Sequence, residues 1–249
     1  MTERKKVVIV GLGEIGKPLF DLCSGQHETV GVDIEPAVDR VDHPDFVHIC
    51  YPFQIRDFVG ETARYIELFH PSITVINSTV SVGTTRAIED RTGLPVVNSP
   101  VRGKHARMLD DLRRYTKFVG AANPEVGQKA AEHFQSLGLK TKVLSSPEAT
   151  ELAKLTETTY FGVMIAWAQE VERYCDRAGQ NYEDVISFYE EIGFFPPVKY
   201  FPGIIGGHCV MPNIEILRTF DHSQFLEAIK ASNEMKKQRE VRKEVEAVA

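Results

Sequence analysis

Short apolar runs rich in β-branched residues alternate with helical patterns through the first half of the chain. The runs predict six strands, at Lys6–Val10, Thr29–Val32, Phe46–Cys50, Thr74–Asn77, Pro95–Asn98 and Lys117–Gly120. Strands that alternate with helices are typical of a parallel sheet with crossover helices. The pattern therefore predicts an α/β fold with a doubly wound, mostly parallel sheet.

The pattern changes after Ser146, where one long helix is predicted from Glu148 to Gly179. Ser146 or Thr150 would cap its start, and Gly179 would end it. Residues 160–168 of this helix are apolar nearly all the way round, so we expect other helices or a second subunit to enclose them. The second alternative predicts a homodimer through the long helix.

Strand patterns largely disappear beyond the long helix. A helix is predicted at Tyr182–Glu191, then a segment rich in Phe, Pro and Gly at 193–207, then a last helix from about His222 into the charged residues 236–246. We therefore expect a sheet domain at residues 1–146 and an all-helical domain for substrate binding and dimerisation at residues 147–249.

The composition excludes several classes of protein. With 249 residues, 43% of them apolar and 26% charged, the chain can form one sizeable core and a smaller second module, and it is neither disordered nor collagen-like. A net charge of −6 gives no general attraction for nucleic acid or an anionic membrane, which favours a small-molecule partner. The sequence shows no membrane-spanning run and no signal peptide, so a soluble, cytoplasmic protein is expected.

The four cysteines are Cys23, Cys50, Cys175 and Cys209, which are widely separated and form no C-x-x-C pair. This spacing favours neither a zinc site nor a thioredoxin-type redox pair. We therefore expect no metal, and we expect each cysteine to be a thiol, one of which is chemically active.

A glycine-rich loop follows the first predicted strand. The sequence Gly11-Leu12-Gly13-Glu14-Ile15-Gly16 precedes a helical segment at 17–23, which is the context that a dinucleotide-binding G-x-G-x-x-G requires. Gly11 permits the tight turn, Gly13 lets backbone N–H groups approach a pyrophosphate, and Gly16 lets helix and strand pack closely. The sheet is thus predicted to be Rossmann-type, with Glu14 and Ile15 also at the cofactor.

Asp33 ends the second predicted strand, where a carboxylate accepts hydrogen bonds from the adenosine ribose. Because a carboxylate there repels a 2′-phosphate, NAD is favoured over NADP. Tyr51, Pro52 and Thr79, which follow the next two strands, are assigned to the same site. The alternative is an ordinary glycine turn beside a surface aspartate.

Five further motifs follow one another along the chain: NSTVSVGTT at 77–85, NSP at 98–100, ELAKL at 151–155, QEVE at 169–172 with Cys175 and Gly179, and PGIIGGHC at 202–209. Their order and spacing resemble the UDP-glucose/GDP-mannose dehydrogenase family over essentially the whole chain. Members of that family oxidise a primary alcohol of a sugar nucleotide twice, with two NAD molecules, and hold the intermediate on a cysteine as thiohemiacetal and then thioester. The resemblance implies an NAD-dependent dehydrogenase that acts on a CH–OH group.

By this resemblance Cys209 is the nucleophile, and His208 beside it helps to hold the thiolate. Gly206 and Gly207 give the preceding loop the freedom to place the sulfur close to a substrate. The alternative for a lone cysteine is a small, buried apolar residue.

The resemblance also gives Lys154 and Thr79 roles at the reacting carbon. Lys154 matches the lysine that stabilises the alkoxide or oxyanion, and its alternative is an exposed helix lysine. Thr79 matches the threonine that orients water or the substrate hydroxyl, and its alternative is a helix N-cap for the segment near Gly83.

Three positions depart from the family pattern. Val101 stands where the family has the glutamate credited with activating water, Thr158 replaces an asparagine, and Asn213 replaces an aspartate. Asn213 still forms hydrogen bonds but cannot act as a base. If a thioester is hydrolysed, His208 or Glu157 would have to activate water.

The chain ends at Ala249, whereas full members continue into a domain that binds the nucleotide of the substrate. We expect either a substrate that is not a nucleotide sugar or a separate subunit that supplies this surface. A basic segment offers compensation, because Arg102, Lys104 and His105 follow a strand end and could bind an anionic group, together with Thr158. The alternative is a solvated charge run that balances Asp110 and Asp111.

The sequence leaves three functions open. The first is an NAD-dependent oxidation of an alcohol on an anionic, sugar-like or nucleotide-sugar-like substrate, with covalent catalysis by Cys209. The second is a two-electron dehydrogenase of the β-hydroxyacid type, which does not need Cys209. The third is a non-catalytic NAD-binding subunit that regulates a partner enzyme.

Overall fold

The computed structural model describes residues 4–33, 41–103, 107–189, 191–192, 200–207, 209–220 and 223–248. The chain divides into two compact units, Met1–Lys154 and Leu155–Ala249. The predicted boundary after residue 146 lies where the long helix starts, and the two units divide within that helix.

The first unit contains a seven-stranded sheet in the order β2-β1-β3-β4-β5-β6-β7. The strands are β1 (Lys6–Val10), β2 (Glu28–Val32), β3 (Phe46–Ile49), β4 (Ile73–Ile76), β5 (Val96–Asn98), β6 (Lys117–Ala121) and β7 (Thr141–Leu144). All neighbours are parallel except β5 and β6, which are antiparallel. The predicted doubly wound, mostly parallel sheet is confirmed, and each of the six predicted strands is found within one residue of its expected bounds.

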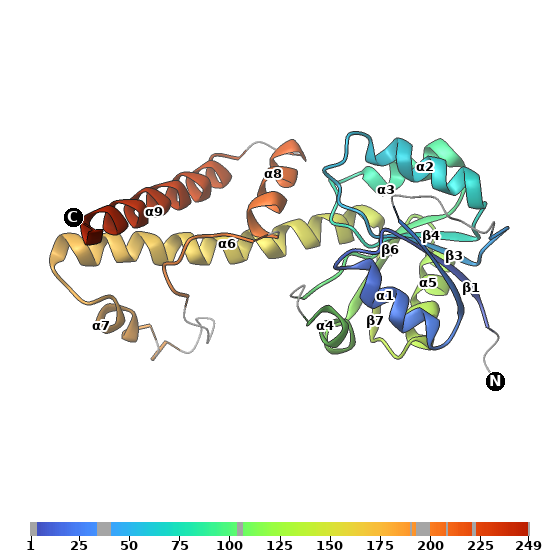
Figure 1. The fold of residues 1–249 in the computed structure, drawn as a ribbon, viewed down its shortest axis with the longest axis horizontal. Coiled ribbons are helices and arrows are strands. Elements are labelled where there is room, and N and C mark those ends of the chain that lie inside the picture. Colours follow the sequence, from blue (N-terminus) through green and yellow to red (C-terminus); the bar gives the residue numbers. More distant parts are fainter. Residues whose placement is uncertain are drawn as a thin grey trace. The chain divides into compact units, whose positions relative to one another are not determined.

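Helices cover both faces of this sheet (Figure 1). One face carries α1 (Gly16–Ser24), α4 (Met108–Arg114) and α5 (Pro124–Ser136), and the other carries α2 (Phe58–Phe69) and α3 (Thr84–Thr92). Side chains of β1 alternate between the two apolar layers, with Val7 and Ile9 on the first face and Val8 and Val10 on the second. Burial of both faces explains why the strands are apolar runs without a polar side.

The long helix α6 (Pro147–Ala178) confirms the prediction for this segment. The Ser146 hydroxyl accepts a hydrogen bond from the Ala149 N–H at 3.2 Å and caps the first turn. Gly179 has a φ of +66°, and Gln180 N–H donates to the Cys175 carbonyl, so the helix ends in a left-handed glycine as expected.

Beyond α6 the second unit contains α7 (Tyr182–Ser187), α8 (Val210–Phe220) and α9 (Gln224–Val248). The predicted helix at Tyr182–Glu191 is too long. Only Ile186 of α7 is buried, whereas Phe188 is 78% exposed, so apolar burial does not support another turn. The start of the last helix agrees with the prediction to within a few residues, although His222 lies outside the described residues.

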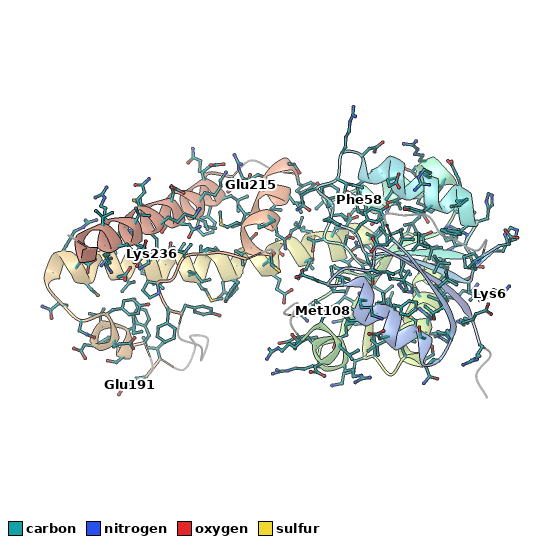
Figure 2. The ribbon with its side chains drawn as sticks, in the orientation of Figure 1. Lys6, Phe58, Met108, Glu191, Glu215 and Lys236 are labelled. Atoms are coloured by element: carbon teal, nitrogen blue, oxygen red, sulfur yellow. The ribbon has the colours of Figure 1, made fainter. Side chains whose placement is uncertain are left out.

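A polar seam joins α6 to α9 along the second unit. Gln169 hydrogen-bonds Asn233 and Ser232, and Lys236 donates to both carboxylate oxygens of Glu172 at 3.0 and 2.7 Å. Figure 2 shows Lys236 on the side of α9 that faces α6. This seam sets the register of the two helices.

The apolar stretch of α6 is not fully enclosed within the chain. Tyr160, Phe161 and Trp167 are 54%, 46% and 53% exposed, so the prediction that other helices enclose this stretch is wrong for these three side chains. Their exposure leaves the second alternative, a second subunit, as a prediction.

Candidate functional site

The glycine loop lies where the order of the strands reverses, between β1 and β3. Ligands of doubly wound sheets bind at this edge. Gly11 has a φ of +88°, and a Cβ there would lie 3.0 Å from the Tyr51 nitrogen. A Cβ on Gly16 would overlap the Gly11 carbonyl oxygen, whereas a Cβ on Gly13 would have no atom within 4 Å. Gly11 and Gly16 are therefore required by the fold, and Gly13 faces open space.

The N-cap position of α1 provides no side-chain cap. Its N-cap residue is Ile15, and Gly13 and Glu14 beside it are exposed. Uncapped N–H groups at a helix start bind anions such as a pyrophosphate. The loop therefore fits a dinucleotide.

The other residues assigned to the cofactor follow neighbouring strands at the same edge. Asp33 is exposed directly after β2, and Tyr51 and Pro52 follow Cys50 after β3. The Ser78 hydroxyl donates to the Tyr51 carbonyl at 2.5 Å, which joins the β4 turn to the β3 turn and places Thr79, half-buried, beside them.

A buried carboxylate organises the next turn. Glu151 of α6 is 1% exposed and accepts hydrogen bonds from the Gly83 N–H at 2.7 Å, the Thr85 N–H at 2.8 Å and the Thr85 hydroxyl at 2.6 Å. Burial raises the pKa of Glu151, and these hydrogen bonds oppose the shift. The start of α3 is thus capped from α6, with Gly83 in the N-cap position, so the alternative role of Thr79 as this cap is wrong.

Further contacts hold the first turns of α6 on the sheet. Thr150 lies 3.5 Å from the Asn98 carbonyl, and a Cβ on Gly120 would overlap Ser146 and Thr150. Arg86 forms an ion pair with Glu148 at 2.5 Å. Lys154, which is half-buried, is one turn beyond Thr150 on the same side of the helix. Its position is therefore fixed by the same packing.

A buried lysine, not predicted from the sequence, lies under this edge. Lys117 is 4% exposed and donates to the Asn77 side-chain oxygen at 3.0 Å and to the Ser99 carbonyl. Burial is the main reason that its pKa falls to about 7; the charge of Cys50 opposes the fall and the charge of Lys154 adds to it.

The lysine orders a chain of buried side chains. Because Lys117 donates to the Asn77 oxygen, the Asn77 amide nitrogen faces His48 Nδ1 at 3.1 Å and makes that nitrogen the acceptor. The His48 Nε2–H then donates to His133 Nε2 at 3.0 Å, which leaves the proton of His133 on Nδ1, an atom without a hydrogen-bond partner. The histidines therefore have assigned tautomers.

Cys23, His48 and His133 bring one ligand atom each within 4.8 Å of one another, a spacing open to a metal ion. A metal on His48 Nε2 would need the proton on Nδ1, facing the Asn77 amide N–H. The hydrogen bonds to Asn77 and Lys117 disfavour that tautomer, so the described residues fit a hydrogen-bonded core better than a metal centre.

Acidification is expected to destabilise the protein through this core. Burial lowers the pKa of His48 to about 3 from 6.5, and His133 shifts in the same direction. At pH values between the unfolded and the folded pKa of a histidine, the unfolded chain binds a proton that the folded chain does not. For each such histidine, the free energy of unfolding should therefore fall by about 1.4 kcal/mol for every unit by which the pH is lowered in this range.

Urea unfolding at pH 7 to 4 tests this expectation. His48→Leu should show a shallower fall than the wild type, and His70→Asn, which removes an exposed histidine, should not. An equal slope in all three proteins would contradict the assignment.

The second unit brings Cys209, Asn213 and Thr158 together. Cys209 is half-buried and directly precedes α8, and its carbonyl accepts the Asn213 N–H at 3.1 Å. The buried Asn213 side chain donates to the Thr158 hydroxyl at 3.1 Å. Gly206 and Gly207 precede Cys209, Gly207 with a φ of +77°, whereas His208 lies outside the described residues.

The basic segment is described only in part. The Arg102 guanidinium stacks over the Tyr115 and Phe118 rings at 5.4 and 5.6 Å, while Lys104 and His105 lie outside the described residues. Nearby, Arg107 pairs with the buried Asp111 at 3.2 Å. Val101, 6% exposed, belongs to the apolar core, so the position of the family's glutamate is filled by core packing.

The sequence contains only a partial signal for Glu151 and Lys117, the two site residues that sequence analysis did not identify. Glu151 belongs to the ELAKL motif, but its contacts with Gly83 and Thr85 arise only from the fold. Lys117 begins a predicted strand, where a lysine ordinarily indicates an exposed end.

None of the helices that the structure describes has the length and hydropathy to cross a membrane.

Residues 148–236 match the model of the UDP-glucose/GDP-mannose dehydrogenase family, central domain. The chain is 25% identical to a UDP-N-acetyl-D-mannosamine dehydrogenase from Methanococcus vannielii over 83% of its own length, and it spans 59% of that relative.

Two solved structures share the fold. The UDP-D-ManNAc dehydrogenase of Pyrococcus horikoshii has a TM-score of 0.77 at 21% identity, with 94% of this chain and 68% of that chain covered. The 3-hydroxyisobutyrate dehydrogenase of Mycobacterium tuberculosis has a TM-score of 0.68 at 17% identity, with 94% of both chains covered. The predicted resemblance to the UDP-glucose/GDP-mannose dehydrogenase family is confirmed, and residues 148–236 match the central domain of that family.

Proposed function

We propose that the protein is an NAD-dependent oxidoreductase of the cytoplasm that oxidises an alcohol group of an anionic sugar or nucleotide sugar. The observation that carries the proposal is the uncapped, glycine-lined start of α1 at the edge of the sheet where Thr79 also lies. The relative from Methanococcus vannielii supports the choice of substrate class, because its name specifies a UDP-linked N-acetylated sugar.

Residues of the first unit would hold the cofactor. The N–H groups at the start of α1 bind the pyrophosphate past Gly13, which offers no side chain, and the exposed Asp33 carboxylate accepts hydrogen bonds from the ribose. Bound NAD supplies a hydride acceptor. The chain's own residues then have to orient the alcohol and take its proton.

Lys154 and Thr79 suit that task. The Thr79 hydroxyl orients the substrate hydroxyl, and the Lys154 amine takes its proton or stabilises the oxyanion as hydride leaves. Glu151 and Thr150 fix the helix turn that carries Lys154, so the amine is preorganised.

Cys209 extends the reaction beyond an aldehyde. Its thiolate attacks the aldehyde carbon, an S–C bond forms, and the carbonyl electron pair moves to oxygen, which is protonated. With a second bound NAD as the hydride acceptor, loss of that proton would give a thioester on Cys209, and attack by water would break the S–C bond and return the thiolate. Asn213 and Thr158 form the hydrogen-bonded support behind Cys209.

Arg102 is the described residue best suited to an anionic group of the substrate. Two aromatic rings hold its guanidinium in place, which lowers the entropy lost on binding.

We further propose that Trp167 and its exposed neighbours on α6 form a homodimer interface. Sedimentation of the wild type and of Trp167→Glu tests this interface.

The number of NADH formed per product tests this function. The protein is incubated with NAD and a panel of nucleotide sugars, sugar acids and small hydroxyacids, in parallel with Cys209→Ala. We expect two NADH per product from the wild type, and at least a hundredfold loss of acid formation in Cys209→Ala because no thioester forms. Cys175→Ala, which changes a buried thiol away from the proposed chemistry, is the matched control.

Other stoichiometries would favour the alternatives. One NADH per product, with Cys209→Ala fully active, would indicate a two-electron dehydrogenase of the β-hydroxyacid type. This alternative is favoured by the 3-hydroxyisobutyrate dehydrogenase structure, because the similarity covers 94% of both chains. NAD binding without turnover of any substrate would indicate a regulatory subunit.

A further inference from the structure

Two buried side chains, here called the loop clamp, hold the loop that leads to Cys209. Asn233 of α9 is 1% exposed and binds the backbone of Ile205 twice: its Oδ1 accepts the Ile205 N–H at 2.7 Å, and its Nδ2 donates to the Ile205 carbonyl at 3.0 Å. Gln169 of α6 is fully buried, and its Nε2 donates to the Gly203 carbonyl at 2.8 Å. The loop is thus bound from both α6 and α9.

The donors and acceptors of the loop clamp are ordered by two further side chains. Arg173 donates to the Ser232 hydroxyl oxygen at 3.0 Å. Because a guanidinium can only donate, the Ser232 O–H donates in turn to Gln169 Oε1, also at 3.0 Å. The Gln169 Nε2 then faces the Gly203 carbonyl and Asn233 Oδ1. Both amides of the clamp therefore have one orientation that satisfies these hydrogen bonds.

Polar contacts, more than apolar burial, set the path of this loop. Of residues 203–207 only Ile205 is buried, whereas Ile204 is 48% exposed. A buried amide that loses its partner destabilises the fold, so Gln169 and Asn233 favour the one loop conformation that supplies their partners.

The chain beyond the clamp reaches a second fixed point at the start of α8. The Ile205 side chain lies in the same apolar cluster as Val210. A Cβ on Gly162 of α6 would lie 2.8 Å from the Val210 side chain, so α8 starts close against α6. Gly207, with a φ of +77°, makes the turn between the two points. Cys209 therefore lies on a short segment that is held at both ends.

We propose that Asn233 and Gln169 are positioning residues for Cys209 in the oxidation proposed above, on which this inference rests: by binding the loop backbone they hold the sulfur where it captures the aldehyde. The step concerned is the S–C bond that the thiolate forms with the aldehyde carbon, whose carbonyl electron pair moves to oxygen and takes up a proton. The first oxidation relies on Lys154 and Thr79, which are not part of the loop clamp. Loss of the clamp should therefore release aldehyde rather than abolish turnover.

Alkylation of Cys209 tests the clamp without any substrate. Intact protein is pulsed with iodoacetamide, and peptide mass spectrometry quantifies the modification in the wild type, Asn233→Asp and Gln169→Met. Asp keeps the size and the acceptor of Asn233 but loses the donor, and Met keeps the length of Gln169 without its polar atoms. Gln238→Met, an exposed change on α9, is the matched control, and the buried Cys175 is the internal reference. Circular dichroism identifies the folded variants.

We expect Cys209 alkylation to accelerate about fivefold or more in Asn233→Asp and Gln169→Met, because the half-buried sulfur becomes accessible when the loop detaches, and to stay at the wild-type rate in Gln238→Met. If turnover is found, the first two variants should release aldehyde and form acid with a kcat about tenfold lower, while KM and the rate of the first NADH stay within about twofold of the wild type.

A Cys209 alkylation rate that does not rise in the folded Asn233→Asp and Gln169→Met proteins would overturn the proposal. Acid formation at the wild-type rate, with two NADH per product, would overturn it as well. Since alkylation needs no substrate, a protein without turnover would refute the proposed function, while the alkylation rates would still decide whether the loop clamp positions Cys209.

Discussion

Replacing Gly16 by alanine is expected to lower the free energy of unfolding by about 4 kcal/mol or more, or to prevent folding. The added Cβ would overlap the Gly11 carbonyl oxygen and lie 3.2 Å from Cys50 Cβ, and neither neighbour is the end of a flexible side chain. Denaturant unfolding of the purified variant measures the effect.

Gly13→Ala is the matched comparison. A Cβ at Gly13 meets no atom within 4 Å, so the variant should unfold as the wild type does. It should nevertheless bind NAD at least tenfold more weakly by calorimetry, because the methyl group occupies the approach to the α1 N–H groups. A stable Gly16→Ala protein, or wild-type NAD binding by Gly13→Ala, would contradict the two different roles.

Glu151→Ala is expected to destabilise the first unit by about 3 kcal/mol or more, because three donors of Gly83 and Thr85, the two of Thr85 buried, lose their acceptor. The carboxylate also joins α6 to the start of α3, so the Lys154 turn should loosen. Thermal unfolding and hydrogen exchange of residues 83–85 measure both effects.

Glu148→Ala is the control for this change. Its partner Arg86 is 44% exposed, and a surface ion pair contributes about 1 kcal/mol or less. Equal destabilisation by the two alanine variants would show that burial of the Glu151 carboxylate has no special role.

The sheet and the cofactor loop could be predicted because their signals are local. Each buried strand is a short apolar run, and Gly11 and Gly16 stand at fixed positions after the first of them. The helix α6 was equally clear, since Ser146 and Gly179 mark its ends.

Two elements were missed for physical reasons. The edge strand β7 is short and largely half-exposed, so its residues form no apolar run. The helix α8 carries Pro212 in its first turn, where proline is tolerated, and its apolar positions Val210, Ile214 and Leu217 follow a helical spacing that could have revealed it.

The buried polar groups of the site depend on contacts between distant segments. Lys117 meets Asn77 across 40 positions, and Glu151 meets Thr85 across 66. A single sequence contains no signal for such pairs, so Lys117 and His48 could be assigned only from the fold. Conversely, Cys209 and Asn213 are close in the sequence, and the Asn213 N–H donates to the Cys209 carbonyl at the start of α8.

The central claim, that the chain is an NAD-dependent alcohol oxidoreductase, is tested most directly by the absorbance of reduced nicotinamide. The protein is mixed with NAD and each member of the nucleotide-sugar and hydroxyacid panel, and Lys154→Met is measured alongside. The account predicts NADH formation that requires protein, NAD and one class of anionic alcohol, and that falls at least a hundredfold in Lys154→Met while NAD still binds. NAD binding without NADH formation on any substrate, or undiminished turnover in Lys154→Met, would contradict it.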